Sequence, residues 1–355
     1  MNKRIVFLSG FLLIMLACTL GNPPQSQTSD LLATLAASTP LTGSPAAPSG
    51  EASESPTLSS VILPTPIPST LTVPTSASTG QPTGKIVYTC QIFKVQAGNQ
   101  ICIINADGTG FRRLTTDDSK QHYYPSLSPD GRSVIYAAFR ESNVYEIYEM
   151  NIASGAVVQL TNRLGNLNAP EISPDGESIV FKRARPNSDE NQLFLMERNG
   201  ADPNNIPALS GWDPTWSPDG KLILFASNRD GAVQLFTVRA NGKGLHKVSN
   251  LPAIRGRSDW SPDGKYIVTY SGAPWEHEVF LMTADGSNAH ILSPLGGNSQ
   301  GASFSPDSQW IAFTAYFDHP SDDHGCEIYI MRIDGTDLRR LTSNDYCDYQ
   351  PRWGP

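Results

Sequence analysis

The chain has 355 residues, a formal net charge of −8 and 17% charged residues. Its length could hold more than one ordinary domain, and its five cysteines leave one over if the others form disulfides. The acidic balance, without a basic stripe, excludes the electrostatics typical of nucleic-acid binding, so we expect no nucleic-acid partner.

The first 17 residues resemble a secretion signal. Lys3 and Arg4 precede an apolar stretch, residues 5–17, which is too short to span a bilayer but has the length of a signal-peptide core. The stretch ends in the letters MLAC, which resemble a bacterial lipoprotein signal with Cys18 as the acylated first residue. An ordinary cleaved signal peptide that contains a cysteine is the alternative. We expect residues 1–17 to be a lipoprotein signal peptide and Cys18 to carry lipid.

Residues 18–83 have the composition of a linker. After Cys18 they contain no aromatic residue, lysine, arginine or cysteine, and proline, serine, threonine and alanine dominate. Such a segment cannot bury enough apolar surface to offset the entropy lost on ordering. The sequence therefore predicts a disordered tether between the lipid anchor and the rest of the chain.

The phrase Ser-Pro-Asp-Gly, or a close variant, recurs five times at spacings of 45, 44, 44 and 44 residues. Its serines are Ser128, Ser173, Ser217, Ser261 and Ser305. Proline pre-sets φ for the first corner of a turn and glycine adopts the left-handed conformation, so each phrase predicts a hairpin turn. The apolar run after each turn is typical of a strand covered on both faces. A constant period of this size indicates an array of repeated units.

A second pattern has six copies, each a strand that begins with Glu or Gln and leads to a hairpin signal. The copies begin at Gln100, Glu146, Gln192, Gln234, Glu278 and Glu327. The missing sixth copy of the first pattern is divided between the chain ends, because Trp353 stands where Trp216 stands in its repeat and the strand that should follow is found at residues 84–90. We therefore predict an all-β, six-bladed propeller of four-stranded antiparallel blades over residues 84–355. The C-terminal strand pairs with the N-terminal strands of the same blade and closes the ring.

These repeats resemble those of the TolB-like propeller family. The resemblance rests on the Ser-Pro-Asp-Gly turn followed by the patterns GK-x-I-x-F and IYxM-x-x-DG, and it covers about residues 84–355. It implies a six-bladed propeller that serves mainly as a binding platform.

The four cysteines other than Cys18 permit three disulfide pairings. The predicted strands place Cys90 and Cys102 on neighbouring strands of the divided blade, while the segments that hold Cys326 and Cys347 emerge on the same face of the propeller. We expect the disulfides Cys90–Cys102 and Cys326–Cys347, with free buried thiols as the alternative.

Two stretches could carry chemistry. Residues 297–301 fit G-x-S-x-G, and Asp318 and His324 follow Ser299 in the chain order of a triad. A nucleophile elbow, however, needs a strand, a sharp turn and a helix, whereas Ser299 falls in a predicted connection between blades. The stretch 318–327 offers oxygen and nitrogen ligands for a metal yet matches no calcium-loop spacing. Its weak candidate ligands are Asp318, Asp322, Asp323 and His324. We interpret the stretch as a long surface loop and expect no catalytic residue, metal or cofactor.

Six polar residues stand just before the apolar residue of each blade start: Ser126, Glu171, Thr215, Asp259, Ser303 and Arg352. Strand alternation puts them opposite the apolar residue, so on innermost strands they can face the central channel. In the structural interpretation these residues are polar only because the water-filled channel of any propeller must be polar. The functional hypothesis is an ion or small-ligand site whose charged groups are Glu171, Asp259 and Arg352.

The connections between blades open on one face, and we expect them to carry exposed large residues of the types enriched in binding hot spots. The candidates for a binding face are Tyr123, Tyr124, Trp212, Asp213, Arg257 and Tyr349. In the alternative interpretation these residues only pack over the ends of the blades.

The sequence thus predicts a membrane-anchored, extracytoplasmic and monomeric propeller that binds a protein, peptide or glycan of the cell envelope without catalysing a reaction. It would face the periplasm or the cell exterior. The alternative is an envelope hydrolase or lyase that acts on polysaccharide, with or without a metal ion.

Overall fold

The structure is a computed structural model that describes residues 80–92, 98–141, 144–185, 191–317 and 325–355. These residues belong to one compact unit, Thr70–Pro355. The predicted signal peptide, Cys18 and nearly all of the predicted linker lie outside the described residues, as do the four candidate metal ligands of the stretch 318–327.

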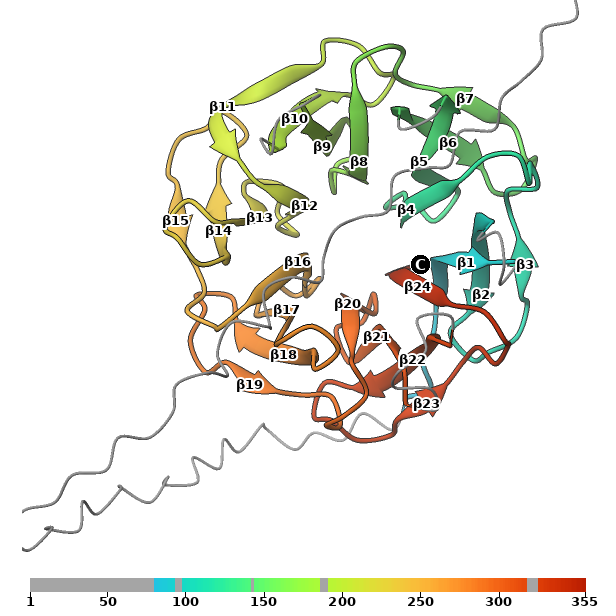
Figure 1. The fold of residues 1–355 in the computed structure, drawn as a ribbon, viewed down its shortest axis with the longest axis vertical. Coiled ribbons are helices and arrows are strands. Elements are labelled where there is room, and N and C mark those ends of the chain that lie inside the picture. The colour runs from blue at the N-terminus through green and yellow to red at the C-terminus, as the bar shows by residue number, and fades with distance from the viewer. Residues whose placement is uncertain (1–79, 93–97, 142–143, 186–190, 318–324) are drawn as a thin grey trace, which may run out of the picture. The chain divides into compact units, whose positions relative to one another are not determined.

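The described residues form six antiparallel sheets of four strands each, arranged as the blades of a propeller (Figure 1). From its inner to its outer strand, the first blade contains β24 (Asp348–Gly354), β1 (Lys85–Gln91), β2 (Asn99–Asn105) and β3 (Arg112–Arg113). The second contains β4 (His122–Leu127), β5 (Ser133–Glu141), β6 (Val144–Asn151) and β7 (Val157–Gln159). The third contains β8 (Asn166–Ile172), β9 (Ser178–Ala184), β10 (Asn191–Glu197) and β11 (Asn204–Ser210).

The remaining three blades follow in chain order around the ring. The fourth contains β12 (Trp212–Trp216), β13 (Ile223–Ser227), β14 (Gln234–Val238) and β15 (His246–Lys247). The fifth contains β16 (Ile254–Trp260), β17 (Tyr266–Ser271), β18 (Glu278–Thr283) and β19 (His290–Ile291). The sixth contains β20 (Gln300–Phe304), β21 (Trp310–Ala315), β22 (Glu327–Arg332) and β23 (Arg339–Arg340). No helix long and apolar enough to cross a bilayer occurs in this part of the chain.

The ring closes as the sequence predicted. The C-terminal strand β24 pairs with β1, so that Trp353 stands opposite Ile86 and Arg352 stands opposite Val87. In Figure 1 the two strands lie side by side where the C-terminus is marked. The divided blade and the count of six blades are thereby confirmed.

The Ser-Pro-Asp-Gly turns are held by hydrogen bonds within each phrase. In all five, the serine hydroxyl donates to the aspartate Oδ1 at 2.5–2.7 Å, and that oxygen accepts the backbone N–H two residues further on. The serine Oγ also accepts the N–H that begins the next strand. In Gly264 the φ of +74° is the left-handed turn conformation that glycine tolerates best. The phrase therefore recurs because it forms the turn.

The second pattern has an equally local cause. In five blades the buried Glu or Gln accepts a hydrogen bond of 2.5–2.7 Å from a serine or threonine hydroxyl in the connection to the next blade. That hydroxyl accepts the backbone N–H of the residue after the Glu or Gln at 2.8–2.9 Å. These buried polar residues hold the connections against the blades.

The hydrophobic clusters join neighbouring blades. One contains Trp216 and Phe225 of the fourth blade with Val180 and Leu193 of the third. Another joins Trp353 and Ile86 of the first blade to Trp310 of the sixth. Because each blade buries its faces against its neighbours, the stability of one blade depends on the completeness of the ring.

Deletion of residues 350–355 tests this dependence. The deletion removes most of β24, including Trp353, and leaves β1 as an open edge next to an exposed hydrophobic cluster. We expect aggregation or a broad, non-cooperative thermal transition, measured by circular dichroism and light scattering.

The matched comparison is Trp216→Ala, which removes a core aromatic but leaves the ring closed. It should cost about 3–5 kcal/mol and keep a single sharp transition. A truncated protein that melts sharply near the parent temperature would contradict the dependence on ring closure.

Candidate binding site in the central channel

The innermost strand of every blade has a bulge at the same position. Pairing with the neighbouring strand shifts register there in all six blades, and each bulge contains a residue with a left-handed backbone. These residues are Tyr124 (φ 54°), Ala169 (50°), Asp213 (49°), Arg257 (37°), Gly301 (60°) and Gln350 (57°). Five of the six are not glycine, and such backbone conformations are uncommon and cluster at functional sites.

Five of these bulge residues line one cavity of about 250 Å³ at the mouth of the channel formed by the connections between blades. We call it the loop-face pocket. Besides Tyr124, Asp213, Arg257, Gly301 and Gln350, its walls include side chains from the second strands and the start of β20. Tyr270, Gln300, Thr314 and Tyr349 are among its other lining residues.

The structure brings four of the six binding-face candidates together in this pocket: Tyr124, Asp213, Arg257 and Tyr349. The other two are engaged beside it, since Trp212 Nε1 donates to the Arg255 carbonyl at 3.1 Å and the Tyr123 hydroxyl accepts from Asn99 at 2.7 Å. The prediction that Arg257 lies exposed on a loop between blades was wrong. Its bulge draws it into the channel, and it is only 5% exposed.

Sequence reasoning missed Gln300, Gln350, Tyr270 and Thr314. A signal existed for Gln350, because it stands at the same offset in its repeat as Tyr124, Asp213 and Arg257. Thr314 comes from β21 opposite Gln300, and Tyr270 comes from β17 opposite Gly256. No repeated pattern marks these second-strand positions.

The three charged channel candidates converge at the waist of the channel. Arg352 Nη2 lies 3.3 Å from Glu171 Oε2, and its Nη1 lies 3.7 Å from Asp259 Oδ2. The polar residues of the same ring complete the network, because Thr215 donates to Glu171 at 2.7 Å and Ser303 donates to Asp259 at 2.7 Å. Burial raises the pKa of Glu171, and the charge of Arg352 opposes this increase. The waist is therefore a largely self-satisfied ion network.

A second cavity, of about 440 Å³, lies on the other side of this network, on the face of the short turns. We call it the turn-face pocket. Its floor is Glu171, Asp259 and Arg352, and its walls are aromatic residues and turn prolines such as Trp260 and Pro262. The carboxylates of Glu171 and Asp259 already have protein partners, and Arg352 Nη1, which makes no hydrogen bond, lies 3.7 Å from Asp259 Oδ2.

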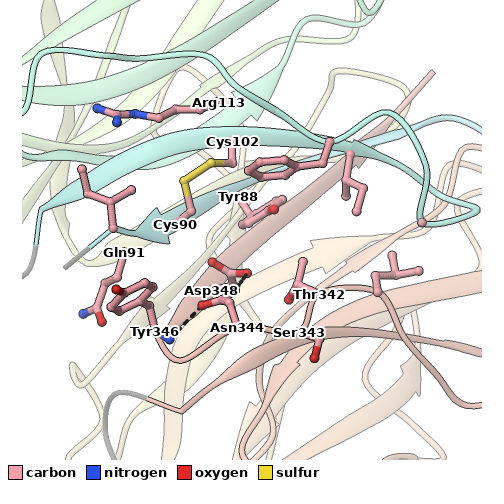
Figure 2. A pocket seen from close by; sticks show the side chains of 15 residues that line it. Tyr88, Cys90, Gln91, Cys102, Arg113, Thr342, Ser343, Asn344, Tyr346 and Asp348 are labelled. Carbon is pink, nitrogen blue, oxygen red and sulfur yellow. Dashed lines mark hydrogen bonds between the residues drawn. A yellow bond between two sulfur atoms is a disulfide. The ribbon is translucent and has the colours of Figure 1, made fainter. Parts of the chain in front are cut away.

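A third cavity, of about 420 Å³, lies between the first and sixth blades (Figure 2). Tyr88, Phe111 and Leu341 are among its apolar lining residues. Asp348 lies at its base, 2% exposed, and accepts a hydrogen bond from Asn344 Nδ2 at 2.8 Å. Burial, together with the charge of Glu327, raises the pKa of Asp348 to about 8. This carboxyl group is thus protonated in the folded protein below that pH.

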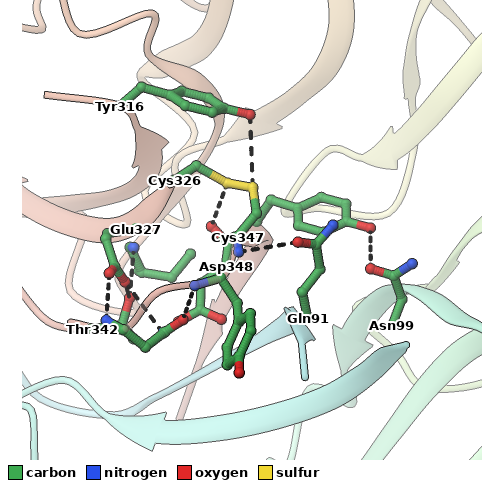
Figure 3. Close-up of a disulfide and its surroundings, with 12 residues drawn as sticks. Gln91, Asn99, Tyr316, Cys326, Glu327, Thr342, Cys347 and Asp348 are labelled. Atoms are coloured by element: carbon green, nitrogen blue, oxygen red, sulfur yellow. Dashed lines mark hydrogen bonds between the residues drawn. A yellow bond between two sulfur atoms is a disulfide. The ribbon is translucent and has the colours of Figure 1, made fainter. Parts of the chain in front are cut away.

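Two disulfides reinforce the same seam of the ring. Cys90 is joined to Cys102 across β1 and β2, and Cys326, just before β22, is joined to Cys347, just before β24. This is the pairing expected from the sequence. Figure 3 shows that Cys347 also contacts β1, since its N–H donates to the Gln91 Oε1 at 3.2 Å. The second disulfide therefore anchors the C-terminal strand beside the loop-face pocket, which Cys347 helps to line.

The G-x-S-x-G stretch does not form a nucleophile elbow. Ser299 is fully buried, its hydroxyl has no hydrogen-bond partner, and the strand β20 rather than a helix follows it. Its N–H donates to the His277 carbonyl at 2.7 Å. The residues that would follow it in a triad, Asp318 and His324, lie outside the described residues. In the part of the chain that the structure describes, no three His, Cys, Asp or Glu residues gather as a metal site.

Comparison with known proteins relates this chain to one family. A family model described as the TolB beta propeller domain matches residues 76–322. An uncharacterized protein of Agrobacterium fabrum is 32% identical over 136 residues, which are 38% of this chain and 45% of that protein. The Tol-Pal system protein TolB of Francisella tularensis is 29% identical over 120 residues, which are 34% of this chain and 27% of TolB. The chain thus matches less than half the length of either relative.

Solved structures share the fold at lower identity. The crystal structure of TolB from Acinetobacter baumannii has a TM-score of 0.67 and 24% identity, over 78% of this chain and 68% of that chain. Hydrazine synthase of Kuenenia stuttgartiensis has a TM-score of 0.61 and 15% identity, over 76% of this chain and 46% of that chain. Because both a TolB and an enzyme carry the fold, the fold does not decide the activity.

The raised pKa of Asp348 predicts how stability depends on pH. The folded protein binds this proton more tightly than the unfolded chain, whose ordinary pKa is 3.8. The resulting stabilisation is complete below about pH 4 and is lost as the pH rises to about 8, by at most about 1.4 kcal/mol per pH unit. Asp348→Asn should therefore lose less stability than the parent between pH 5 and pH 8 in urea denaturation.

The control is Asp345→Asn, which changes an exposed aspartate in the same connection. It should keep the parent's dependence on pH. Parallel curves for the parent and Asp348→Asn would show that Asp348 is not the group responsible.

Proposed function

The chain belongs to the TolB β-propeller family, and from that premise we propose that it is a non-catalytic binding protein of the cell envelope. In this proposal it is exported, held at a membrane by lipid on Cys18, and set off from that membrane by the linker 18–83. Its loop-face pocket binds a segment of a partner protein. The two disulfides support an exported protein, because disulfides persist mainly in oxidising compartments.

The observation that carries the proposal is the convergence of the bulges. The repeat places a left-handed residue at the same mouth in every blade, and the side chains there are tyrosine, aspartate, arginine and glutamine as well as alanine and glycine. A backbone conformation of this kind costs on the order of 1–3 kcal/mol at a non-glycine residue. A mouth built from such residues and lined with aromatic and polar groups is typical of a binding site.

The two mouths of the channel differ in what they offer a partner. In the turn-face pocket the carboxylates of Glu171 and Asp259 already have hydroxyl and arginine partners, and Arg352 Nη1, which has no hydrogen bond, is next to the Asp259 carboxylate at 3.7 Å. In the loop-face pocket Arg257 Nε and Thr314 Oγ1 are buried and have no hydrogen-bond partner. A buried polar group without a partner costs free energy, which a ligand recovers by bonding to it. This difference favours the loop-face pocket.

The comparisons support a protein as the partner. The relative from Francisella tularensis is named as a Tol-Pal system protein, so that protein works in a system with other components. Its partners are not transferred to this chain, which matches only 27% of it. A peptide segment fits a pocket of about 250 Å³, which is smaller than the usual site for a drug-sized molecule.

Cys18→Ala tests the anchor. Without the thiol no lipid can be attached, so the full-length variant should move from the membrane fraction to the soluble fraction while its thermal transition is unchanged. The double variant Cys90→Ala, Cys102→Ala is the matched control, since it removes two cysteines of the propeller and should remain with the membrane. If Cys18→Ala stays membrane-bound after a salt wash, the anchor lies elsewhere.

Variants of the two mouths test the binding site. The double variant Tyr270→Ala, Gln300→Ala removes two side chains that line the loop-face pocket. We expect it to weaken binding of the partner protein, which is first identified by cross-linking in intact cells. The loss should be about thirtyfold or more, since hot-spot residues contribute about 2 kcal/mol or more each. Affinity for the purified partner is measured by calorimetry, with melting curves to verify folding.

Trp260→Ala with Pro262→Ala is the control at the turn-face pocket and should leave the affinity unchanged. The reverse outcome, loss only with this control, would move the site to the other mouth. Turnover of an envelope polysaccharide by the purified protein would instead favour the hydrolase or lyase.

A further inference from the structure

Arg257 is a buried cation without a carboxylate partner. Its side chain is 5% exposed, and its Nη2 donates to the carbonyl oxygens of Gln350 at 3.0 Å and Pro125 at 3.2 Å. Its Nε has no acceptor, and no carboxylate among the described residues lies at ion-pair distance from its guanidinium. The Tyr124 ring lies 5.6 Å from the guanidinium carbon. A buried charge in this state is destabilising unless something pairs with it.

The carboxylates of the channel are used elsewhere. Glu171 and Asp259 pair with Arg352 at the waist. Asp213, in the loop-face pocket itself, accepts the backbone N–H of Arg257 at 3.0 Å rather than the guanidinium. Burial lowers the pKa of both Lys182 and Arg257, and the charge of Asp213 opposes the decrease at both, so this one carboxylate is shared between two cations. Arg257 therefore has no carboxylate of its own at ion-pair distance.

Arg257 remains charged at neutral pH. Burial and the charge of Arg352 lower its pKa to about 10, although the charges of Asp213 and Glu171 oppose the decrease, and this value is still well above physiological pH. A second unmet donor lies in the same pocket, because Thr314 is 2% exposed and its hydroxyl has no partner. Two independent polar groups, one of them cationic, therefore lack an acceptor in one small cavity.

We propose that the loop-face pocket binds a carboxylate of the partner, with Arg257 as the cationic contact and Thr314 as a second donor. Arginine is well suited to this because its fork of donors matches the two oxygens of a carboxylate. A cavity of about 250 Å³ admits a chain end or one side chain, not a folded domain. Asp213 lines the same cavity and repels an anion, so a singly charged carboxylate fits better than a doubly charged phosphate.

The proposal rests on the proposed function and names the chemistry of that same site. The carboxylate has two sources, the C-terminus of a chain or an acidic side chain. Three probes separate them: N-acetyl-Gly-Gly-Leu with a free C-terminus, the amide of that peptide, and N-acetyl-Gly-Glu-Gly amide. Each is titrated against the purified full-length protein in detergent by ligand-observed NMR.

We expect one or both carboxylate peptides to bind and the uncharged amide to bind at least about tenfold more weakly, as for loss of a charge-assisted hydrogen bond. Arg257→Gln should weaken the carboxylate peptide about ten- to a hundredfold. Arg255→Gln is the matched control, because Arg255 is an exposed arginine of the same strand that does not line the pocket. It should change nothing.

Two further variants keep the test decisive if Arg257→Gln fails to fold. Asp213→Asn keeps an acceptor for the backbone N–H of Arg257 and removes the competing negative charge, so the carboxylate should bind several-fold more tightly. Thr314→Val removes the unmet hydroxyl at nearly equal volume, so binding should weaken several-fold while folding is retained.

The outcomes separate this site from the proposed function. Equal binding of acid and amide, no binding of any probe, or equal effects of the Arg255 and Arg257 variants overturns the carboxylate site. If the Tyr270→Ala, Gln300→Ala variant nevertheless fails to bind the partner protein, the proposed function stands without the carboxylate site. Arg257-dependent binding of a carboxylate peptide, with no envelope partner at this mouth, contradicts the proposed function alone.

Discussion

The pairing of β24 with β1 is the constraint on which the propeller depends. It joins residues more than 250 positions apart, such as Ile86 and Trp353, and so incurs the entropy of closing a very long loop. The two disulfides lie on either side of this pairing. Trp353 also donates through Nε1 to the Thr83 carbonyl at 2.8 Å, which holds the start of the propeller against its end. The two disulfides and this hydrogen bond thus reinforce the one blade whose inner strand, β24, is not joined to its neighbour β1 by a loop.

The fold could be predicted because its signals are local. A turn such as Ser261 to Gly264 is closed by its own serine and aspartate, so the phrase identifies the turn without knowledge of the neighbouring blades. The buried glutamate or glutamine of the second pattern likewise bonds a hydroxyl about 15 residues further on. Ring closure followed from counting, since one pattern had six copies and the other five.

The candidate site was less predictable because it depends on distances across the ring. Alternation placed Glu171, Asp259 and Arg352 in the channel, but their ion pairs follow from the width of the channel. The bulges reverse the expected environment of Arg257, which lies in the channel instead of on an exposed loop. Thr314 reaches the pocket from a second strand by pairing with Gln300. Such a contact leaves no trace in a linear pattern.

The repeats also indicate where this propeller is specialised. At the turns, five blades use nearly the same residues, because each copy solves the same local problem of backbone geometry. At the bulges, the six backbones share a left-handed conformation, yet the side chains are Tyr, Ala, Asp, Arg, Gly and Gln. A ring with one backbone geometry and six different side chains presents an asymmetric surface at the centre of a symmetric scaffold. A ligand in the loop-face pocket meets five of these six residues, together with neighbours such as Tyr270, Gln300 and Thr314. The specificity of the molecule should therefore reside in these five positions and in the second-strand residues that pair beside them.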